Sequence, residues 1–286
     1  MATAILTSTC DLLARYPVVF CDVWGVLHDG VREYAAAGDA LARYRAGGGV
    51  VVLLSNAPVP AATVERVLAE KGVRASAWDA IVSSGDVTRV HIEERAYRNI
   101  HHIGPDRSLV LFDDLDAKLA PLEGAEAIVC TGLFHDATET GDTYRPLLQR
   151  AHDRRLPLVC ANPDLVVEVG GALLPCAGVV GAVYAEIGGD VYWAGKPHAP
   201  AYAMAFATAA KIAGRQIQLR DVLAIGDAVA TDLAGAAAYG IAALFIAGGI
   251  HRAASMSAGT INPTALAKLF ASHGATAVAA APALVW

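Results

Sequence analysis

Residues 17–27 read PVVFCDVWGVL, and this stretch decides the fold that we expect for the rest of the chain. The run VVFC is apolar up to Asp22, so it predicts a strand that is buried on both faces. Asp22 lies where this strand ends, and HDG at 28–30 predicts a turn soon afterwards. A buried strand that delivers a carboxylate to a loop is typical of parallel α/β sheets, whose ligands bind beyond the carboxyl ends of the strands.

Apolar runs of the same kind recur along the chain and alternate with helical patterns. Further strands are expected at 49–57, 79–85, 221–227 and 242–249. A helix is expected to begin at Pro60 and to end just before Gly72, because proline suits the first helical position and glycine the position after the last. This alternation predicts an α/β fold with a mostly parallel sheet.

The middle of the chain contains αβ units of its own. Helices are expected at 91–98 and 143–155, and strands at 99–105, 126–132 and 156–164. These units are sufficient for a second domain that is inserted into the first. We therefore predict a core formed by residues 1–83 and 191–286, with an inserted α/β domain over residues 84–190.

The composition favours a folded protein that does not bind nucleic acid. Of the 286 residues, 55% are hydrophobic and 17% are charged, so we expect a large core and little disorder. The formal net charge is −6, and the basic residues form no stripe that would follow a nucleic acid backbone. A phosphate site on such a chain must be built locally from a lysine, a metal ion or backbone amides.

The cysteines and the apolar segments bear on the location of the protein. The five cysteines are scattered without a CxxC pair, which favours reduced, buried thiols and a cytoplasmic location. The stretch 1–17 lacks the positive region of a secretory signal. Residues 233–250 are uncharged and long enough to suggest a membrane span, but their alanine and glycine content favours a helix, a stop at Gly240 and a strand.

Polar side chains follow apolar strands, or precede the adjacent helices, at four places. These are Asp22, the pair Ser55 and Asn56, Lys196 in WAGKPHAPAY, and the aspartates Asp227 and Asp232 of GDAVATD. Each is a weak signal alone, because turns and helix caps use the same residue types. Since the carboxyl ends of parallel strands meet at one edge of a sheet, the four places together predict one site.

These residue types together suit phosphoryl transfer. Asp22 can attack phosphorus to form an aspartyl phosphate while its other oxygen binds a metal ion, for which Asp227 supplies a second carboxylate. A site with few carboxylates and several waters suits Mg²⁺. Lys196 and the metal would neutralise the phosphoryl charge, and Ser55 with backbone N–H groups would bond its oxygens. Asp232 lies near a helix start, where it can cap the helix, orient Lys196 or hold a metal-bound water.

The four motifs resemble those of the haloacid dehalogenase superfamily, in order and over nearly the whole chain. DVWGVLHDG, LLSNAP, AGKP and GDAVATD are similar to its four motifs, and the chain looks like class IIA, the p-nitrophenylphosphatase and sugar-phosphatase group. The resemblance implies a Rossmann-like core, a cap domain at 84–190, Mg²⁺, and hydrolysis of small phosphate esters through a phospho-aspartate. The stretch ANPD at 161–164, with the glycine-rich segment after it, also resembles class IIA caps.

The resemblance also implies a role for each matching residue. Asp22 and Lys196 would be catalytic. The remaining roles would be phosphate binding by Ser55, Asn56, Lys196 and Gly25, and metal binding by Asp22, the backbone carbonyl of Trp24, Asp227 and Asp232.

Trp24 departs from the family pattern, because typical phosphatases of this superfamily have a second aspartate at this position. That aspartate protonates the leaving group and later activates water, and a tryptophan can do neither. We expect the loss to cost about 10²–10⁴-fold in rate, or roughly 3–5 kcal/mol of barrier, and to affect alkyl phosphates more than aryl or acyl phosphates. His28, Asp29 and His198 are candidates to replace the acid, and Trp24 can also be a packing residue.

Two other functions stay open on the sequence. One is a catalytically weak protein that binds a phosphorylated ligand, because the site lacks its acid. The other is a dehalogenase that attacks carbon without a metal, since those family members also have an aromatic residue at this position, but the carboxylates of GDAVATD disfavour it. The expected partners are a small phosphorylated substrate and, in a homodimer, a second copy of the chain, with no nucleic acid and no membrane.

Three further polar clusters have simpler interpretations. LFDDLDA at 111–117 imitates an acidic motif, but it lies in the inserted domain without a partner lysine and is interpreted as a solvated loop. His101 and His102 are adjacent on an expected strand, so they point to opposite faces and do not share a metal ion. Asn162 and Asp164 are interpreted either as a simple turn or as cap residues that reach the core site.

Overall fold

A computed structural model describes residues 3–286 of the chain. Its tertiary contacts form two units, each of which is described separately. The first unit comprises residues up to Ser55, Glu65–Val82 and Tyr202–Trp286, and the second comprises Asn56–Val64 and Ser83–Ala201. The division into a core and a cap domain with boundaries at 84 and 190 stays a prediction.

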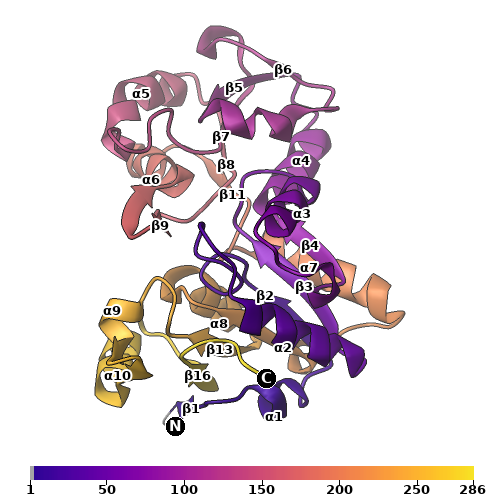
Figure 1. Ribbon diagram of the computed structural model, residues 1–286. Coiled ribbons are helices and arrows are strands. Elements are labelled where there is room, and N and C mark those ends of the chain that lie inside the picture. The colour runs from indigo at the N-terminus through magenta and orange to yellow at the C-terminus, as the bar shows by residue number, and fades with distance from the viewer. Residues whose placement is uncertain (1–2) are drawn as a thin grey trace. The chain divides into compact units, whose positions relative to one another are not determined.

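The first unit is built on a seven-stranded sheet with the strand order β1-β16-β13-β12-β2-β3-β4 (Figure 1). Neighbouring strands from β1 to β3 in this order pair in parallel. The strands span Ala4–Ile5 (β1), Val18–Cys21 (β2), Val50–Ser55 (β3), Ala80–Ser83 (β4), Val222–Gly226 (β12), Ala242–Ile246 (β13) and Ala279–Ala281 (β16). Each of the five strands predicted for this sheet is confirmed, and each lies within its predicted range.

The composition of the central strands explains their place in the middle of the sheet. Every residue of VVFC in β2 and of VLAIG in β12 is buried. In β3, VVVLLS is buried at five of its six positions. A parallel strand between two layers of helices has no solvated face, which is why these strands are continuous apolar runs rather than alternating patterns.

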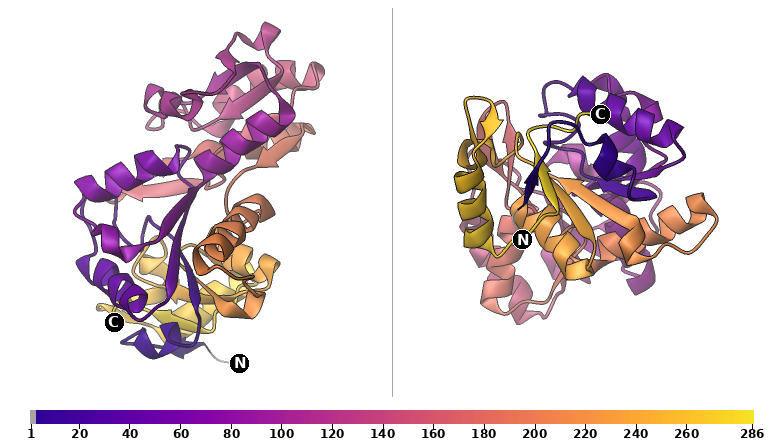
Figure 2. Two further views of the ribbon diagram at one scale, coloured as in Figure 1. Left: turned by 90° about the vertical axis from the view of Figure 1, so that its right-hand side faces the viewer. Right: turned by 90° about the horizontal axis from the view of Figure 1, so that it is seen from below.

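Helices lie on both faces of this sheet. On one face, Phe20 of β2 packs edge-on against Phe206, whose ring stacks on Tyr239. These two partners belong to α7 and α8, whereas α1 and α2 lie on the opposite face (Figure 2). The helices are α1 (Cys10–Leu13), α2 (Ala35–Ala46), α3 (Ala61–Glu70), α7 (Ala199–Ala213), α8 (Ala234–Tyr239), α9 (Arg252–Ser255) and α10 (Pro263–His273), and a short hairpin, β14 (Met256–Ser257) and β15 (Thr260–Ile261), precedes α10.

The order of the strands reverses between β2 and β12. From β2 the chain continues to β3 and β4 on one side, and from β12 it continues to β13 and β16 on the other. The two strands are hydrogen-bonded neighbours, with Cys21 opposite Ile225. Ligands of open α/β sheets bind at such a switch point, beyond the carboxyl ends of the strands. Both strands are followed there by an aspartate, Asp22 and Asp227.

The second unit is built on a five-stranded sheet with the strand order β11-β8-β7-β5-β6, in which every pair is parallel. One face is covered by α5 and α6, where Leu148 and Val180 share a buried cluster with Ile128. The other face is covered by α4, where Ile92 packs in a cluster with Val129 (Figure 1). This confirms the α/β architecture predicted for the middle of the chain. The elements are α4 (Ser84–Arg95), α5 (Arg145–Asp153), α6 (Ala177–Ile187), β5 (Asn99–Ile103), β6 (Lys118–Leu119), β7 (Ala127–Cys130), β8 (Leu158–Cys160), β11 (Val191–Trp193) and an antiparallel hairpin of β9 (Val166–Val169) and β10 (Ala172–Pro175).

Helix α4 differs most from its expected position. A helix is expected at 91–98, whereas α4 begins at Ser84 and ends at Arg95. Ser83 caps it, because the Asp86 N–H donates to the Ser83 hydroxyl at 2.9 Å and the Ser83 N–H donates to the Asp86 carboxylate at 3.1 Å. This capping box satisfies two terminal N–H groups, and it also ends β4 at Ser83 rather than at 85.

Residues 233–250 form the predicted helix, glycine stop and strand. Helix α8 ends at Tyr239, Gly240 has a left-handed φ of 77°, and β13 follows. Over residues 3–286, no helix has both the length and the apolar character that crossing a membrane requires. All five cysteines are free thiols, and four of them are buried as predicted, whereas Cys10 is only partly buried.

Candidate active site

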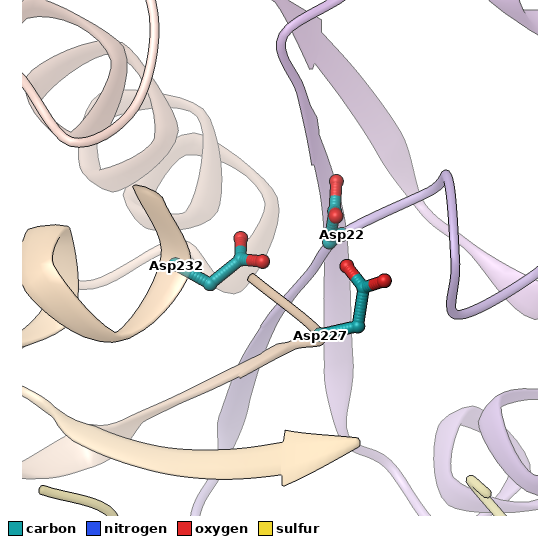
Figure 3. A group of neighbouring side chains, drawn as sticks. All are labelled: Asp22, Asp227 and Asp232. Atoms are coloured by element: carbon teal, nitrogen blue, oxygen red, sulfur yellow. The ribbon is translucent and has the colours of Figure 1, made fainter. Parts of the chain in front are cut away.

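Three carboxylates meet at the carboxyl ends of β2 and β12 (Figure 3). Asp22 follows β2, Asp227 follows β12, and Asp232 lies in the π-helical turn Val229–Leu233 that comes next. One oxygen atom of each carboxylate lies within 4.8 Å of one oxygen of the other two. The structure therefore brings together three of the residues that the sequence predicts as metal ligands.

Backbone hydrogen bonds hold Asp22 in place. Its N–H donates to the carbonyl of Ile225 at 2.8 Å, which extends the pairing of β2 with β12 by one residue. The N–H of Val23 donates to Oδ1 of Asp22 at 2.8 Å. The carboxylate is thus fixed by the strand on one side and by the following loop on the other.

Two glycines make room for the carboxylate of Asp227. A Cβ atom built on Gly25 would lie 2.0 Å from Oδ2 of Asp227, and one built on Gly249 would lie 1.9 Å from the same oxygen. The N–H of Ile250 donates to this oxygen at 2.7 Å. The N–H of Gly25 donates to the His28 carbonyl at 2.8 Å, so the contact of Gly25 that the structure shows is with Asp227, and its contact with phosphate stays a prediction.

Asp232 is held by the turn that it belongs to. The N–H of Ala228 donates to its Oδ2 at 3.0 Å, and its own N–H donates back to the Ala228 carbonyl at 3.0 Å. A Cβ on Gly226 would lie 2.0 Å from Cγ of Asp232, so this carboxylate also depends on a bare glycine. The first N–H of the turn, that of Val229, donates to Nε2 of His251 at 3.3 Å. The loop after β13 therefore supports both carboxylates that follow β12.

The donor set of the three carboxylates fits a hard divalent cation. Mg²⁺ and Ca²⁺ are bound by oxygen ligands, and Mg²⁺ in particular combines one or two carboxylates with waters. Asp227 and Asp232 are each only 4% exposed, whereas Asp22 is partly exposed. Asp22 is thus the member of the group that a substrate can approach.

Ser55 lies at the same edge of the sheet as Asp22. Leu53 of β3 pairs with Cys21 of β2, so Ser55 is placed two residues further along a parallel neighbour, beyond the pair. Its side chain is 7% exposed. The structure therefore places Ser55, from the second predicted motif, beside the first motif at the strand ends.

Asn56 and Lys196 lie in the second unit and contact each other directly. The N–H of Lys196 donates to Oδ1 of Asn56 at 2.8 Å, and Nδ2 of Asn56 donates to the Lys196 carbonyl at 3.1 Å. Nδ2 also donates to Oδ1 of Asp164 at 2.9 Å. Both Lys196 and Asn56 are almost fully buried, at 3% and 5% exposure. The predicted second and third motifs are therefore joined, and the ANPD turn takes part in the contact.

The side chain of Trp24 packs inside its own loop. Its indole lies edge-on to the imidazole of His28, with ring centroids 4.8 Å apart. A Cβ on Gly30 would lie 2.4 Å from Cζ2 of the indole, so the ring also covers this glycine, whose φ is 87°. Trp24 therefore acts as a packing residue for the loop that follows the predicted nucleophile.

His28 and Asp29 are both poorly suited to replace the missing acid at neutral pH. The N–H of Gly30 donates to Nδ1 of His28 at 3.0 Å, so this nitrogen carries no proton. Burial lowers the pKa of His28 from 6.5 to about 4, with the nearby Lys71 adding to the effect. Asp29 accepts from the N–H groups of Arg32 and Val31, and these contacts lower the pKa of its carboxyl, which keeps it ionised. Neither group therefore holds a readily donated proton at pH 7.

The third candidate acid, His198, lies in the second unit and contacts an aromatic side chain there. Its ring stacks on Trp193, with centroids 5.3 Å apart, and burial lowers its pKa below the ordinary value. An imidazole with a lowered pKa is neutral at pH 7, so His198 also lacks the proton that a general acid must donate.

Two of the polar clusters with simpler interpretations have local contacts or exposure that fit those interpretations. His101 and His102 have separate partners: Nδ1 of His101 lies 3.1 Å from the Ala120 carbonyl, and Nε2 of His102 lies 2.8 Å from the Thr131 hydroxyl. In the segment 111–117, the aspartates Asp113, Asp114 and Asp116 are exposed. These findings agree with a structural strand and a solvated loop.

Sequence reasoning missed the part of the site that follows β13. Gly249 leaves room for the carboxylate of Asp227, the Ile250 N–H holds Asp227, and His251 accepts from the turn that carries Asp232. The available signal is the stretch GGIH at 248–251, directly after an apolar strand that borders β12. By the strand-end rule that located the other motifs, this stretch belongs to the same edge.

Comparison with known protein families finds two matching models. The model described as haloacid dehalogenase-like hydrolase matches residues 19–118, and one described as HAD-hydrolase-like matches residues 193–272. The matched segments include the predicted first and second motifs and the third and fourth motifs. No curated protein matches the chain.

Comparison with solved structures finds similar folds over nearly the whole chain. A haloacid dehalogenase-like hydrolase from Brucella suis 1330 is 41% identical with a TM-score of 0.86, covering 98% of this chain and 100% of that one. A possible sugar phosphatase from Cytophaga hutchinsonii is 20% identical with a TM-score of 0.79, covering 98% of each. A glycerol phosphate phosphatase from Mycobacterium tuberculosis, in complex with magnesium, is 21% identical with a TM-score of 0.64, covering 84% of this chain and 70% of that one.

Proposed function

Because the chain belongs to the haloacid dehalogenase-like hydrolases, as its four motifs predict, we propose that it is a Mg²⁺-dependent phosphatase of small phosphorylated metabolites. The proposed reaction proceeds through an aspartyl phosphate on Asp22. Support comes from the fold, which is shared with structures named as a possible sugar phosphatase and a glycerol phosphate phosphatase.

One observation carries this proposal, namely the three carboxylates at the switch point. Asp22, Asp227 and Asp232 place one oxygen each within 4.8 Å of the others. A metal-free dehalogenase would have to bind an anionic halo-acid beside three carboxylates, which repel it. A phosphatase uses the same carboxylates to hold a cation that attracts its anionic substrate, so the carboxylate group favours the phosphatase.

The residues that would hold Mg²⁺ are Asp22, Asp227 and Asp232, with the backbone carbonyl of Trp24 as a further ligand. When bound, Mg²⁺ supplies positive charge that offsets the charge of the phosphoryl group. Trp24 in place of aspartate does not remove this ligand, since a carbonyl is present whatever the side chain. The solved glycerol phosphate phosphatase from Mycobacterium tuberculosis is in complex with magnesium in one structure and with calcium in another, which supports a divalent cation at such a site.

The proposed first step is attack by a carboxylate oxygen of Asp22 on phosphorus. The new bond joins this oxygen to phosphorus, and the bond from phosphorus to the leaving oxygen breaks, so that the leaving group takes the electron pair. Lys196 and Ser55 would bind the phosphoryl oxygens, where charge is spread in the transition state. In the second step, water attacks the same phosphorus, the bond to Asp22 breaks, and inorganic phosphate leaves while the carboxylate is restored.

This chain differs from a typical phosphatase in the source of the proton that the leaving oxygen needs. Trp24 packs on His28, which is neutral because of its pKa of about 4, and Asp29 is ionised in its turn. We therefore infer that the leaving group takes its proton from solvent. Aryl and acyl phosphates, whose leaving groups need little or no protonation, are the preferred substrate class.

Trp24 also favours a second candidate function. A site that binds metal and phosphate but lacks a proton donor can bind a phosphorylated ligand with very slow turnover. A cytoplasmic location and a homodimer stay predictions under either function.

Turnover of a phosphate ester panel, including p-nitrophenyl phosphate and matched alkyl and acyl phosphates, tests the proposal. We expect turnover that requires Mg²⁺, stops in EDTA and is lost in Asp22→Asn. Asp113→Asn removes an exposed carboxylate of the acidic segment at 111–117 and is the matched control, which should keep full turnover. Tight binding of phosphorylated ligands without turnover would support the second function, and halide release without metal would overturn both.

A further inference from the structure

The side-chain amide of Asn56 has all of its hydrogen-bonding groups engaged within the second unit. Oδ1 accepts from the Lys196 N–H at 2.8 Å. The two N–H bonds of Nδ2 have two acceptors, the Lys196 carbonyl at 3.1 Å and Oδ1 of Asp164 at 2.9 Å. An asparagine amide has only two donors, so this arrangement leaves none for a phosphate oxygen.

The two bonds to Lys196 hold the same residue from both sides of its α-carbon. One engages its N–H and the other its carbonyl, so together they restrict the backbone angles that set the direction of its side chain. Asn56 is 5% exposed and Lys196 is 3% exposed, which excludes water as a ready substitute for these bonds. A long lysine side chain reaches a defined point only if its backbone is fixed, and Asn56 provides that constraint.

Asp164 determines which way the amide of Asn56 faces. If the amide were rotated by 180°, its oxygen would face the carboxylate of Asp164 and its NH₂ group would face the N–H of Lys196. Both contacts would be repulsive, so the carboxylate selects the orientation that engages Lys196. Asp164 is itself held by the ANPD turn, because its N–H donates to Oδ1 of Asn162 at 3.0 Å. The ANPD turn therefore holds the carboxylate that orients Asn56, a role that the sequence alone does not distinguish from that of a simple turn.

Gly195 shows how closely Asn56 approaches the lysine loop. A Cβ on Gly195 would lie 2.3 Å from Oδ1 of Asn56, 2.7 Å from Cδ of Pro163 and 2.8 Å from the Ser84 hydroxyl. Its φ lies outside the left-handed region, so only the space that it leaves matters. An alanine there would displace the amide without altering Asn56 itself.

We infer that Asn56 is a positioning residue, oriented by Asp164, that fixes the backbone of Lys196 for its contact with phosphate. This inference rests on the proposed function of Lys196 and replaces direct phosphate binding by the Asn56 side chain. It explains why Asn56, Asp164 and Gly195 belong to three separated sequence motifs and yet meet at one lysine.

Hydrogen exchange at the Lys196 amide tests the constraint without any assumption about activity. Pro197 has no N–H, so exchange near this position reports on Lys196 with little overlap. We expect faster exchange in Asn56→Ala and in Gly195→Ala than in the parent protein. Asn262→Ala is the matched control, since Asn262 caps α10 by accepting from the Thr264 and Ala265 N–H groups. The Asn262→Ala variant should lower the free energy of unfolding without changing hydrogen exchange at Lys196.

Binding of inorganic phosphate in the presence of Mg²⁺ tests the consequence. We expect Asn56→Ala to raise the dissociation constant by about 10–100-fold, the effect of weakening a hydrogen bond to a charged group. Asp164→Ala should have a similar effect, whereas Asp164→Asn should bind nearly as the parent does, because its Oδ1 still accepts from Asn56. A purely structural role would affect thermal stability in both Asp164 variants alike and would not give this rescue.

The outcomes separate this inference from the proposed function. If Asn56→Ala leaves exchange at Lys196 unchanged, or if phosphate binds to it as tightly as to the parent, the positioning role is wrong. If the parent neither binds phosphate nor hydrolyses any ester, while exchange at Lys196 still rises in Asn56→Ala, the phosphatase proposal fails and the backbone constraint on Lys196 stands.

Discussion

The indole of Trp24 lies edge-on to the imidazole of His28, with ring centroids 4.8 Å apart. The residue that replaces the expected acid is therefore also part of the packing of the loop after β2. Replacing Trp24 changes two things at once, namely the chemistry at the leaving group and the order of the loop. The two effects need separate variants.

Trp24→Asp is expected to raise turnover of alkyl phosphates relative to aryl phosphates. The introduced carboxyl can protonate the leaving alkoxide, and general acid help of this kind is typically about 10²–10⁴-fold. Trp24→Phe keeps an aromatic ring without an acid, so it controls for the loss of the indole. The measurement is kcat for a matched pair of alkyl and aryl phosphates in all three proteins. If Trp24→Asp folds, binds Mg²⁺ and gains no alkyl phosphatase activity over Trp24→Phe, the account of the missing acid is wrong.

His28 is expected to make the folded state less stable in weak acid. Its pKa is 6.5 when unfolded and about 4 when folded, so between these values the unfolded chain binds a proton that the folded chain does not. Stability is therefore full above pH 6.5 and is lost as pH falls towards 4. The contribution lost between pH 7 and pH 5 is about 2 kcal/mol.

Urea unfolding of His28→Asn at pH 7 and pH 5 isolates this contribution. Asparagine does not titrate, and its Oδ1 can accept the Gly30 N–H that Nδ1 of His28 accepts at 3.0 Å. The free energy of unfolding should fall less on acidification in the variant than in the parent. An equal fall in both proteins would show that His28 is already charged when folded.

Gly226→Ala is expected to weaken metal binding by displacing Asp232. The new Cβ would lie 2.0 Å from Cγ of Asp232, and the φ of Gly226 is one that alanine adopts without strain. Changes just outside a metal's ligands typically cost about 10–100-fold in affinity, and we expect the Mg²⁺ dissociation constant to rise by at least tenfold. Gly124→Ala, at a position with open space around it, is the control for calorimetric titration. Unchanged affinity in Gly226→Ala would remove Asp232 from the metal site.

The strand-end rule explains which parts of the site the sequence makes predictable. Asp22, Ser55 and Asp227 each follow an apolar run, and hydrophobic pattern locates such runs well because burial on both faces leaves no polar residue within them. The start of helix α4 is harder to predict from the sequence, because it depends on the reciprocal hydrogen bonds of Ser83 and Asp86 rather than on apolar periodicity. Local side-chain bonds of this kind leave only a short signal in the sequence.

The rest of the site depends on close approach, which a sequence does not encode. Gly249 is separated from Asp227 by a helix and a strand, and only the packed structure shows that their atoms compete for one space. The role of Asn56 is likewise hidden in the sequence, because an asparagine after a strand can form hydrogen bonds either to a phosphate or to a backbone group. Its role is shown by the hydrogen bonds of its side-chain amide to Lys196 and Asp164, which come from distant segments of the chain.

His251 provides the last prediction, because it joins the loop after β13 to the turn that carries Asp232. Its Nε2 accepts from the Val229 N–H at 3.3 Å, and its ring packs near Phe245 and His273. We expect His251→Ala to raise the Mg²⁺ dissociation constant by about tenfold and His251→Gln to restore part of the loss, since a glutamine oxygen can accept the same N–H.

Acidification separates positioning by His251 from mere packing. Burial, together with the neighbouring His273, lowers the pKa of His251 below its ordinary value of 6.5. As pH falls through this lowered pKa, Nε2 gains a proton and can no longer accept from Val229. The Mg²⁺ affinity of the parent should therefore fall more steeply with acidification than that of His251→Gln, whose acceptor does not titrate. Parallel pH profiles would mean that the ring of His251 only fills space beside the turn.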